Sequence, residues 1–468
     1  MTLGLGADSG DSRKELPGGG AGELPRGWAR VTLGDLGVDV QPGFASGKHN
    51  RDGDGIVHLR PMNITRNGAI DLSDVRYVDD ESDRRIEYGD VLFNNTNSPA
   101  LVGKTAWVDS LEPVAYSNHM TRLRGPNALD GKFLAIQLHY LWASGYFKTV
   151  LNNHVNQASV SRKVLLDTEI MVPPLAEQRR IVVQVEQQIN HIEAGEDALI
   201  EATRRASDLR SSIADTTISQ HSNAPWERLQ DLLSEPLRNG VSAKATTDGT
   251  GIRTLTLTAV TRNDFSSQFT KTTSADPNRI KNLWLEDQDI FVQRSNSAEL
   301  VGTSAIYRGE NNWAIYPDLL IRVRVDQTRV LPEYAALALR TNRIRFHFRQ
   351  NARGLSGSMP KIDQAMIANV DFPVPSLRQQ REAIEWVMRQ EAAIAPLAAS
   401  VGEAQTESTE LRAALLNAAF SGSLVPQSPS DEPASALLDR IRAAREASHM
   451  RDSRKPRSAP SGQEELFQ

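Results

Sequence analysis

The chain has 468 residues, a hydrophobic content of 39% and a formal net charge of -5. This length predicts about three domains rather than one core. The absence of cysteine excludes disulfides and thiolate metal sites, and the acidic balance means that any nucleic-acid contact must be argued from local sequence. No apolar run approaches the ~20 residues that span a bilayer, so we expect a cytoplasmic protein with no membrane contact.

The first part of the chain predicts a tail followed by a mixed domain. Residues 1–23 are rich in Gly, Ser and acids and lack the apolar core of a signal peptide, which predicts a disordered tail. Residues 24–173 contain short apolar runs bounded by Gly, Asn and Asp, such as GDVLF at 89–93, which predict strands. A helical stretch at 131–151 follows them, so this domain combines helices and strands.

Residues 174–221 predict one long helix. Pro174 suits a helix start, and the residues after it are rich in Ala, Glu, Gln, Arg and Leu. Apolar residues recur at helical steps at Val182, Val185, Ile189, Ile192, Leu199, Ala206 and Ile213, with polar interruptions at Glu196, Thr203 and Arg210. Such a helix would be roughly 65 Å long and would need a partner for its apolar stripe.

Residues 222–374 and 375–422 repeat this plan as a second mixed domain and a second long helix. At an offset of 196, ten of the 28 residues in 41–68 are identical to those in 237–264, where chance predicts about two. At an offset of 199, NSPALVG at 97–103 meets NSAELVG at 296–302. We therefore expect a tandem duplication whose two helices pack antiparallel with pseudo-twofold symmetry.

The last part of the chain predicts a short docking helix and a second tail. Residues 423–448 place Leu437, Leu438 and Ile441 on one helical face. This face predicts docking on a domain of the chain or on a partner, and packing as a simple cap is the alternative. Residues 449–468 are predicted to be disordered.

No motif for catalysis, nucleotide binding or metal binding stands out. GFASGKH at 43–49 has its glycines one residue too close for a P-loop, and no Ser or Thr follows Lys48. DGDG at 52–55 is not followed by the glutamate of a calcium loop, since Asn63 stands at the twelfth position. The Asn-Pro-Pro-aromatic motif of adenine methyltransferases is absent. The sequence therefore predicts a non-catalytic protein that holds no cofactor or metal itself.

Two matching stretches are candidates for DNA contact, since Lys and Arg bind phosphates while Asn, Gln and Arg read base edges. In the second copy, 340–361 contains six cations and no acid: Arg340, Arg343, Arg345, Arg349, Arg353 and Lys361. A solvated face over a core stripe is the alternative. The matching stretch of the first copy, 147–163, is richer in amides, which suit adenine. Its candidates are Lys148, Asn152, Asn153, Asn156, Gln157, Arg162 and Lys163.

A polar loop after one strand of each copy gives a second set of candidates. They are Asn94, Asn95, Asn97 and Ser98 in the first copy, and Gln293, Arg294, Asn296 and Ser297 in the second. The residues that differ between copies fit readers of unlike half-sites, whereas the shared Asn-Ser pair fits DNA contact or turn capping equally. Lys48 and Lys244 lie in matching turns and complete the set.

Four stretches resemble the specificity (S) subunits of type I restriction–modification systems. They are LPRGWARVTLGDL at 24–36, GDVLFNNTNSPALVGKTA at 89–106, PPLAEQRRI at 173–181 and LLNAAFSGSLVPQSPSDEPASALLDRI at 415–441. The resemblance covers roughly residues 24–445. The second copy departs from it, because Arg378 and Gln379 stand where Ala176 and Glu177 stand in the first copy.

The resemblance implies an α+β fold of two tandem target-recognition domains, separated by two long antiparallel coiled-coil helices. Each domain would read one half of an asymmetric bipartite site in double-stranded DNA. The implied partners are two modification (methyltransferase) subunits, which would hold S-adenosylmethionine, and restriction/translocase subunits, which would hold ATP and Mg. The implied docking residues at the two helix starts are Glu177, Gln178, Arg179, Gln380 and Arg381.

Two other functions stay open at this point. A methyltransferase or nuclease acting alone would need a cofactor pocket, for which the sequence shows no motif. A coiled-coil scaffold or adaptor that reads no DNA would explain the helices, but not two duplicated domains with diverged polar loops.

Overall fold

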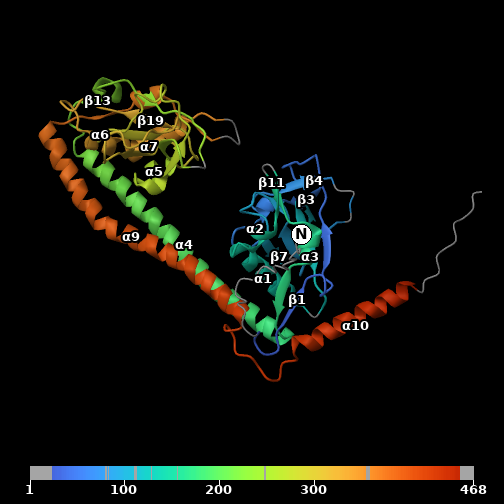
Figure 1. The fold of residues 1–468 in the computed structure, drawn as a ribbon. Coiled ribbons are helices and arrows are strands. Elements are labelled where there is room, and N and C mark those ends of the chain that lie inside the picture. Colours follow the sequence, from blue (N-terminus) through green and yellow to red (C-terminus); the bar gives the residue numbers. More distant parts are fainter. Residues whose placement is uncertain are drawn as a thin grey trace, which may run out of the picture. The chain divides into compact units, whose positions relative to one another are not determined.

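The computed structural model describes residues 24–79, 82, 84–109, 113–127, 129–154, 157–246, 249–354 and 359–453. The chain forms two compact units, unit 1 from residues 1–195 and 407–468 and unit 2 from residues 196–406. Two long helices, α4 (Leu175–Ser219) and α9 (Leu377–Ser421), each contribute one end to each unit (Figure 1). These bounds lie within two residues of the predicted helices.

The centre of unit 1 is an antiparallel sheet of order β2-β9-β5-β7. Its strands are β2 (Asp39–Pro42), β9 (Met120–Arg124), β5 (Val91–Asn94) and β7 (Thr105–Trp107). All of β5 is buried because both faces of the sheet are covered. Val91 and Phe93 share a core with helix α1 (Gly131–Ala143), whereas Leu92 belongs to a core on the opposite face.

Smaller elements surround this sheet. A second layer consists of β3 (Ile56–Leu59), β4 (Arg76–Val78) and β8 (Ala115–Tyr116), with a 3-10 turn at Pro61–Asn63. A small sheet of order β10-β11-β6 contains β10 (Asn152–His154), β11 (Gln157–Ser159) and β6 (Thr96–Asn97), flanked by α2 (Tyr146–Val150) and α3 (Arg162–Leu166). β1 (Ala29–Thr32) pairs with β12 (Glu169–Val172), the strand that leads into α4.

Unit 2 is built in the same way. Its central sheet has the order β14-β19-β17-β18, with β14 (Arg238–Asn239), β19 (Leu320–Val323), β17 (Ile290–Gln293) and β18 (Ser304–Ile306). One face packs on α6 (Pro332–Leu339) and α7 (Asn342–Asn351), and the other on α5 (Leu257–Arg262), β15 (Ile252–Leu255) and β16 (Thr270–Thr273). The remaining elements are β13 (Trp226–Arg228), β20 (Asp371–Pro373), α8 (Gln364–Ala368) and 3-10 turns at Leu229–Leu232 and Ser267–Phe269.

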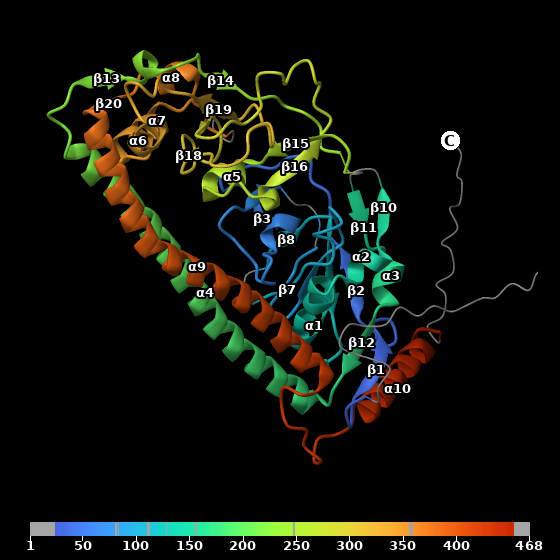
Figure 2. The ribbon, with the colours of Figure 1, turned by 60° about the vertical axis from the view of Figure 1, so that its left-hand side comes forward.

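The two long helices pack against each other within each unit, and both views show them side by side (Figures 1 and 2). In unit 1 the start of α4 shares a core with the end of α9, through Ile181, Val182, Leu416 and Phe420. In unit 2 the end of α4 shares a core with the start of α9, through Ala206, Ile213, Val387 and Ile394. The predicted antiparallel pairing is therefore confirmed, and with it the α+β class with two domains and two long helices.

An ion pair fills one break in the apolar stripe of α4, at Arg210. Arg210 on α4 donates to Glu391 on α9 at 2.9 Å, and Arg340 donates to the same carboxylate at 3.0 Å. The ion pair therefore replaces an apolar contact where the sequence pattern is interrupted. Pro396 lies inside α9, which continues through it.

The C-terminal segment packs on unit 1. Helix α10 (Ala434–Ser453) buries Leu437, Leu438 and Ile441 in the same core as Trp28. The backbone N–H of Ala434 donates to Gly27 at 2.8 Å. The segment therefore docks on a domain of its own chain, and α10 extends five residues beyond the predicted end at 448. In the described part of the chain, no helix has the length and apolarity needed to cross a bilayer.

The repeated heptapeptide ends on a glycine that accommodates an aromatic ring. Gly103 and Gly302 have φ of +98° and +74°, a conformation that side chains disfavour. A Cβ atom added to Gly103 would lie 2.4 Å from the Phe147 ring, and one added to Gly302 would lie 2.6 Å from the Phe348 ring. Packing against a phenylalanine ring therefore explains why the heptapeptide keeps its final glycine in both copies.

The substitution Gly302→Ala is expected to destabilise unit 2 by about 2–4 kcal/mol, through a disfavoured φ and a displaced ring. Gly402→Ala on α9 is the matched control in the same unit, because its Cβ would meet no atom within 4 Å. Exposed helical Gly→Ala changes stabilise by about 0.5–1 kcal/mol. Urea unfolding followed by fluorescence measures both, and equal midpoints for the two variants would contradict this packing.

His139 on α1 lies between two backbone carbonyls. Its Nδ1 is 3.1 Å from the Thr105 oxygen and its Nε2 is 3.1 Å from the Arg66 oxygen. Burial, together with the nearby charges of Arg412 and Lys104, lowers the pKa of His139 to about 4. The ring is therefore neutral at pH 7 and ties α1 to the sheet.

Lowering the pH is expected to weaken unit 1 through this histidine. The folded-state pKa of about 4 lies below the ordinary 6.5, so the unfolded chain binds the proton first. Stability is lost as pH falls from about 6.5 towards 4, by about 1–3 kcal/mol. Urea midpoints at pH 7.5 and 5 should fall less for His139→Gln than for the unmodified chain, and parallel pH dependences would exclude this role of His139.

Candidate nucleic-acid interface

One end of the central sheet of unit 1 gathers most of its candidate residues. The loop after β5 meets the loop before β9, because the Asn95 N–H donates to the His119 oxygen at 3.0 Å. The loop after β2 joins them through the Asn118 N–H, which donates to Phe44 at 3.0 Å. The Val160 N–H donates to Asn95 at 2.9 Å, which adds the β10–β11 hairpin. We call this end the recognition edge of unit 1.

Several predicted side chains project from or near this edge into solvent. Lys48, Ser98, Lys148, Asn152, Gln157, Arg162 and Lys163 are exposed. Asn97 is half-buried, and its Oδ1 accepts from the Ser98 N–H at 2.8 Å. The side chain of Asn153 and all of Asn156 lie outside what the structure describes. The amides and cations predicted from 147–163 thus lie mostly on the surface.

Two asparagines of the same loop hold it in place instead. Asn94 is buried, and its Nδ2 donates to the Leu101 carbonyl at 2.9 Å. Asn95 donates from Nδ2 to the Thr121 hydroxyl at 2.7 Å. Because these donors are engaged inside the unit, we leave both residues out of the proposed DNA surface.

Unit 2 has an equivalent recognition edge. The Arg294 N–H donates to Leu319 at 2.8 Å, and the Ile362 N–H donates to Arg294 at 2.9 Å. Arg353 and Lys361 pair across two backbone hydrogen bonds of 2.8 and 2.9 Å. Arg353 and Lys361 are exposed, and Arg294 is half-exposed. Lys244 and Ser297 are also exposed, each in its own turn. The two candidate stretches of the second copy therefore meet in space.

The amides at the end of β17 and in the loop after it are used internally. Gln293 is buried and donates to the Leu257 carbonyl at 2.9 Å and to the Thr261 hydroxyl at 2.7 Å. Asn296 donates to Gln293 at 2.8 Å and accepts from the Ser297 N–H at 2.8 Å. Gln293 and Asn296 therefore shape the loop, as Asn94 and Asn95 do in unit 1.

The cations at the end of α6 and on α7 do not form a single surface. Arg340 pairs with Glu391, and Arg343 pairs with Asp371 at 2.8 Å. Arg345 donates to the Val301 and Glu299 carbonyls, both at 2.9 Å, and burial lowers its pKa to about 10, so it stays charged at pH 7. Arg349 is the exposed member of this group that has no hydrogen bond or ion pair within the described residues. Most cations of the acid-free stretch 340–351 therefore bind groups within unit 2 instead of forming a charged surface.

The predicted docking residues at the helix starts are mostly buried. Gln178 accepts from the Asp130 N–H at 2.9 Å and donates to the Pro173 carbonyl at 2.9 Å. Gln380 accepts from the Leu331 N–H at 2.8 Å and donates to the Pro375 carbonyl at 2.8 Å. Asp130 and Leu331 are the N-cap residues of α1 and α6. Gln178 thus joins α4 to α1, and Gln380 joins α9 to the equivalent helix α6.

The neighbours of these glutamines differ in exposure. Glu177 is buried and accepts from the Trp28 indole at 3.0 Å, and burial raises its pKa. Arg179 and Arg381 are exposed, which leaves them as the predicted docking residues that a partner could reach. The sequence analysis did not predict that the two glutamines bridge helices. The presence of glutamine at this position in both copies could have indicated a shared structural role.

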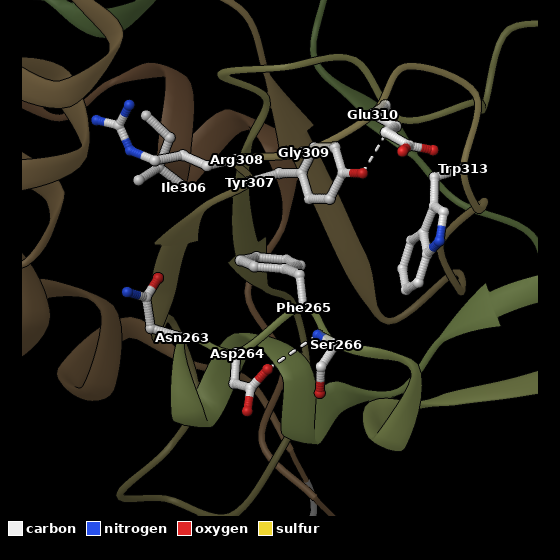
Figure 3. A pocket seen from close by; sticks show the side chains of 10 residues that line it. All are labelled: Asn263, Asp264, Phe265, Ser266, Ile306, Tyr307, Arg308, Gly309, Glu310 and Trp313. Carbon is white, nitrogen blue, oxygen red and sulfur yellow. Dashed lines mark hydrogen bonds between the residues drawn. The ribbon is translucent and has the colours of Figure 1, made fainter. Parts of the chain in front are cut away.

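A cavity of about 570 Å³ lies in unit 2, beside the turn after α5. Figure 3 shows the rings of Phe265, Tyr307 and Trp313 around it. Its polar groups serve local structure, since Asp264 accepts from the Ser266 N–H at 2.9 Å and Arg308 pairs with Glu333 at 3.0 Å. We assign no ligand to this cavity. Among the described residues, no cluster of His, Asp and Glu could hold a metal ion.

Comparison with known proteins agrees with this arrangement. The type I restriction modification DNA specificity domain matches residues 25–202. The chain is 24% identical over 465 residues to the StySPI specificity subunit of Salmonella potsdam, covering 91% of this chain and 97% of the relative. It is 25% identical over 466 residues to the EcoKI specificity subunit of Escherichia coli K12, covering 92% and 97%.

A solved structure described as the basis of complex assembly and conformational transition of the type I R-M system shares the fold. Its TM-score is 0.53 at 19% identity, and the match covers 86% of this chain and 99% of that one. The fold class is thus that of two-domain type I specificity proteins. Over most of its length the chain is thus similar to type I restriction–modification specificity subunits, and residues 25–202 match their DNA specificity domain.

Truncating Gln380 is expected to destabilise unit 2. Gln380→Ala leaves the partly buried Leu331 N–H without its side-chain acceptor, which should cost about 1–3 kcal/mol of unfolding free energy in unit 2. Arg381→Ala is the neighbouring control on the exposed face and should leave stability unchanged within about 0.5 kcal/mol. Urea unfolding measures both variants, and a Gln380→Ala chain as stable as Arg381→Ala would refute the bridge.

Proposed function

We propose that this chain is the DNA-recognition subunit of a type I restriction–modification complex. Each unit would read one half of an asymmetric bipartite site in double-stranded DNA. The observation that carries this proposal is the pair of recognition edges: the same end of the same sheet presents exposed polar side chains in both units. Exposed Asn152 and Gln157 in unit 1 contrast with exposed Arg353 and Lys361 in unit 2, as unlike half-sites require.

The partners proposed are two methyltransferase subunits docked on α4 and α9, joined by restriction/translocase subunits. Docked subunits would cover large apolar side chains that these helices leave exposed, and removing apolar surface from water favours association. These side chains are Val183, Ile200, Leu209, Met388, Leu397 and Leu411. In this proposal S-adenosylmethionine belongs to the methyltransferase, ATP and Mg belong to the restriction subunit, and this cytoplasmic chain is non-catalytic.

DNA binding should depend on these partners, because the chain carries a formal charge of -5 and phosphate contacts need cations. A gel shift at physiological salt is expected to show at least tenfold tighter specific binding with the methyltransferase subunits than without them. Tight and specific binding by this chain alone would contradict the dependence. If the assembled complex shifts no DNA at all, a coiled-coil adaptor replaces the proposed function.

Lengthening the helices is expected to lengthen the unspecified spacer of the target. One extra helical turn adds about 5.4 Å, which corresponds to one or two base pairs at about 3.4 Å each. Sequencing of methylated sites for the complex with a four-residue insertion should show unchanged half-sites and a longer gap. An unchanged gap would mean that the helices do not set the spacing.

A further inference from the structure

We infer that the two half-sites are chemically different: unit 1 reads an adenine through carboxamides, and unit 2 reads a guanine through cations. This inference rests on the proposed function. The residues responsible are the exposed members of matched rows of three on the small β-ladder beside each recognition edge, together with Gln157 on the same face in unit 1.

The row of unit 1 lies on the sheet β10-β11-β6. Asn152 pairs with Ser159, and Ser159 pairs with Thr96. Gln157 lies two residues before Ser159 and therefore on the same face, while Ala158 between them is buried. The face that carries Asn152 and Gln157 is thus the solvent face of the β10–β11 hairpin, and a two-stranded β-ribbon fits the major groove.

The row of unit 2 has the same pairing. Arg353 pairs with Lys361, and Lys361 pairs with Ser295. Thr96 and Ser295 are equivalent at the offset of 199 that aligns the repeated heptapeptides. The pairing then makes Asn152 equivalent to Arg353 and Ser159 equivalent to Lys361. An amide and a hydroxyl in one unit are therefore replaced by a guanidinium and an ammonium in the other.

These side chains are available for reading. Asn152, Gln157, Arg353 and Lys361 are exposed, and none of their side chains has a hydrogen bond or ion pair within the described residues. This separates them from Asn94, whose amide is fixed inside its unit. Cations for phosphate contact are supplied separately in unit 1 by Arg162 and Lys163, which follow the ribbon on α3.

The chemistry of each row selects a base. Asn and Gln bind adenine bidentately through N6 and N7, whereas Arg and Lys bind guanine through O6 and N7. Each good contact discriminates by about 10- to 100-fold against the wrong base. The unit 1 half-site therefore contains a specified A·T pair, and the unit 2 half-site contains a specified G·C pair.

The test is a reciprocal exchange in the complex with its methyltransferase subunits. Arg353→Asn with Lys361→Ser gives unit 2 the row of unit 1, and Asn152→Arg with Ser159→Lys gives the reverse. A randomised duplex library is bound and the retained sequences are determined. The unit 2 exchange should reduce guanine preference by at least about tenfold at one or two positions of a single half-site. The unit 1 exchange should remove adenine preference in the other half-site only.

Arg228→Asn is the control, because Arg228 is exposed in unit 2 but lies on a different sheet, in β13. It should leave the selected sequence unchanged, and all variants should assemble as the unmodified chain does. An unchanged profile after either exchange overturns the inference, as does equal weakening on every sequence, which would indicate phosphate contacts. Failure of the unmodified complex to select any bipartite sequence would instead overturn the proposed function.

Discussion

The structure depends on the pairing of two apolar helix stripes. A 45-residue helix with one apolar face is unstable alone in water, because most helical stability comes from packing of that face. In this chain α4 and α9 cover each other's stripe, and each domain adds its own core to the pair. The Arg210–Glu391 pair fills a break in the stripe without separating the helices. Because of the duplication, one chain contains both helices of the pair. A single copy would need a second molecule to cover its apolar stripe.

The two copies share residues that pack in the interior and differ in residues that face solvent. Gly103 and Gly302 accommodate equivalent phenylalanine rings, and Gln178 and Gln380 join equivalent helices. The rows beside the recognition edges differ in charge, with Asn152 in one unit and Arg353 in the other. Conserved packing beneath divergent polar residues is what a reader of two unlike half-sites requires.

Sequence reasoning predicted the large features because they follow from periodicity. The period near 200 and the stripe through Val182 and Val185 are read from the residues, whereas the α+β class was implied by the family resemblance. The fate of single polar residues was not predictable, because it depends on contacts between distant segments. Gln293 is buried by residues more than thirty positions away. Arg345 resembles a surface cation in sequence, yet it caps carbonyls of the heptapeptide loop.

The most direct test of the central claim is single-molecule methylome sequencing of the host with and without this gene. A duplicated DNA reader that directs partner enzymes predicts the loss of methylation at one motif, made of two unlike halves separated by a fixed unspecified gap. All other methylation should persist. An unchanged methylome, or loss of a single uninterrupted motif, would contradict the account.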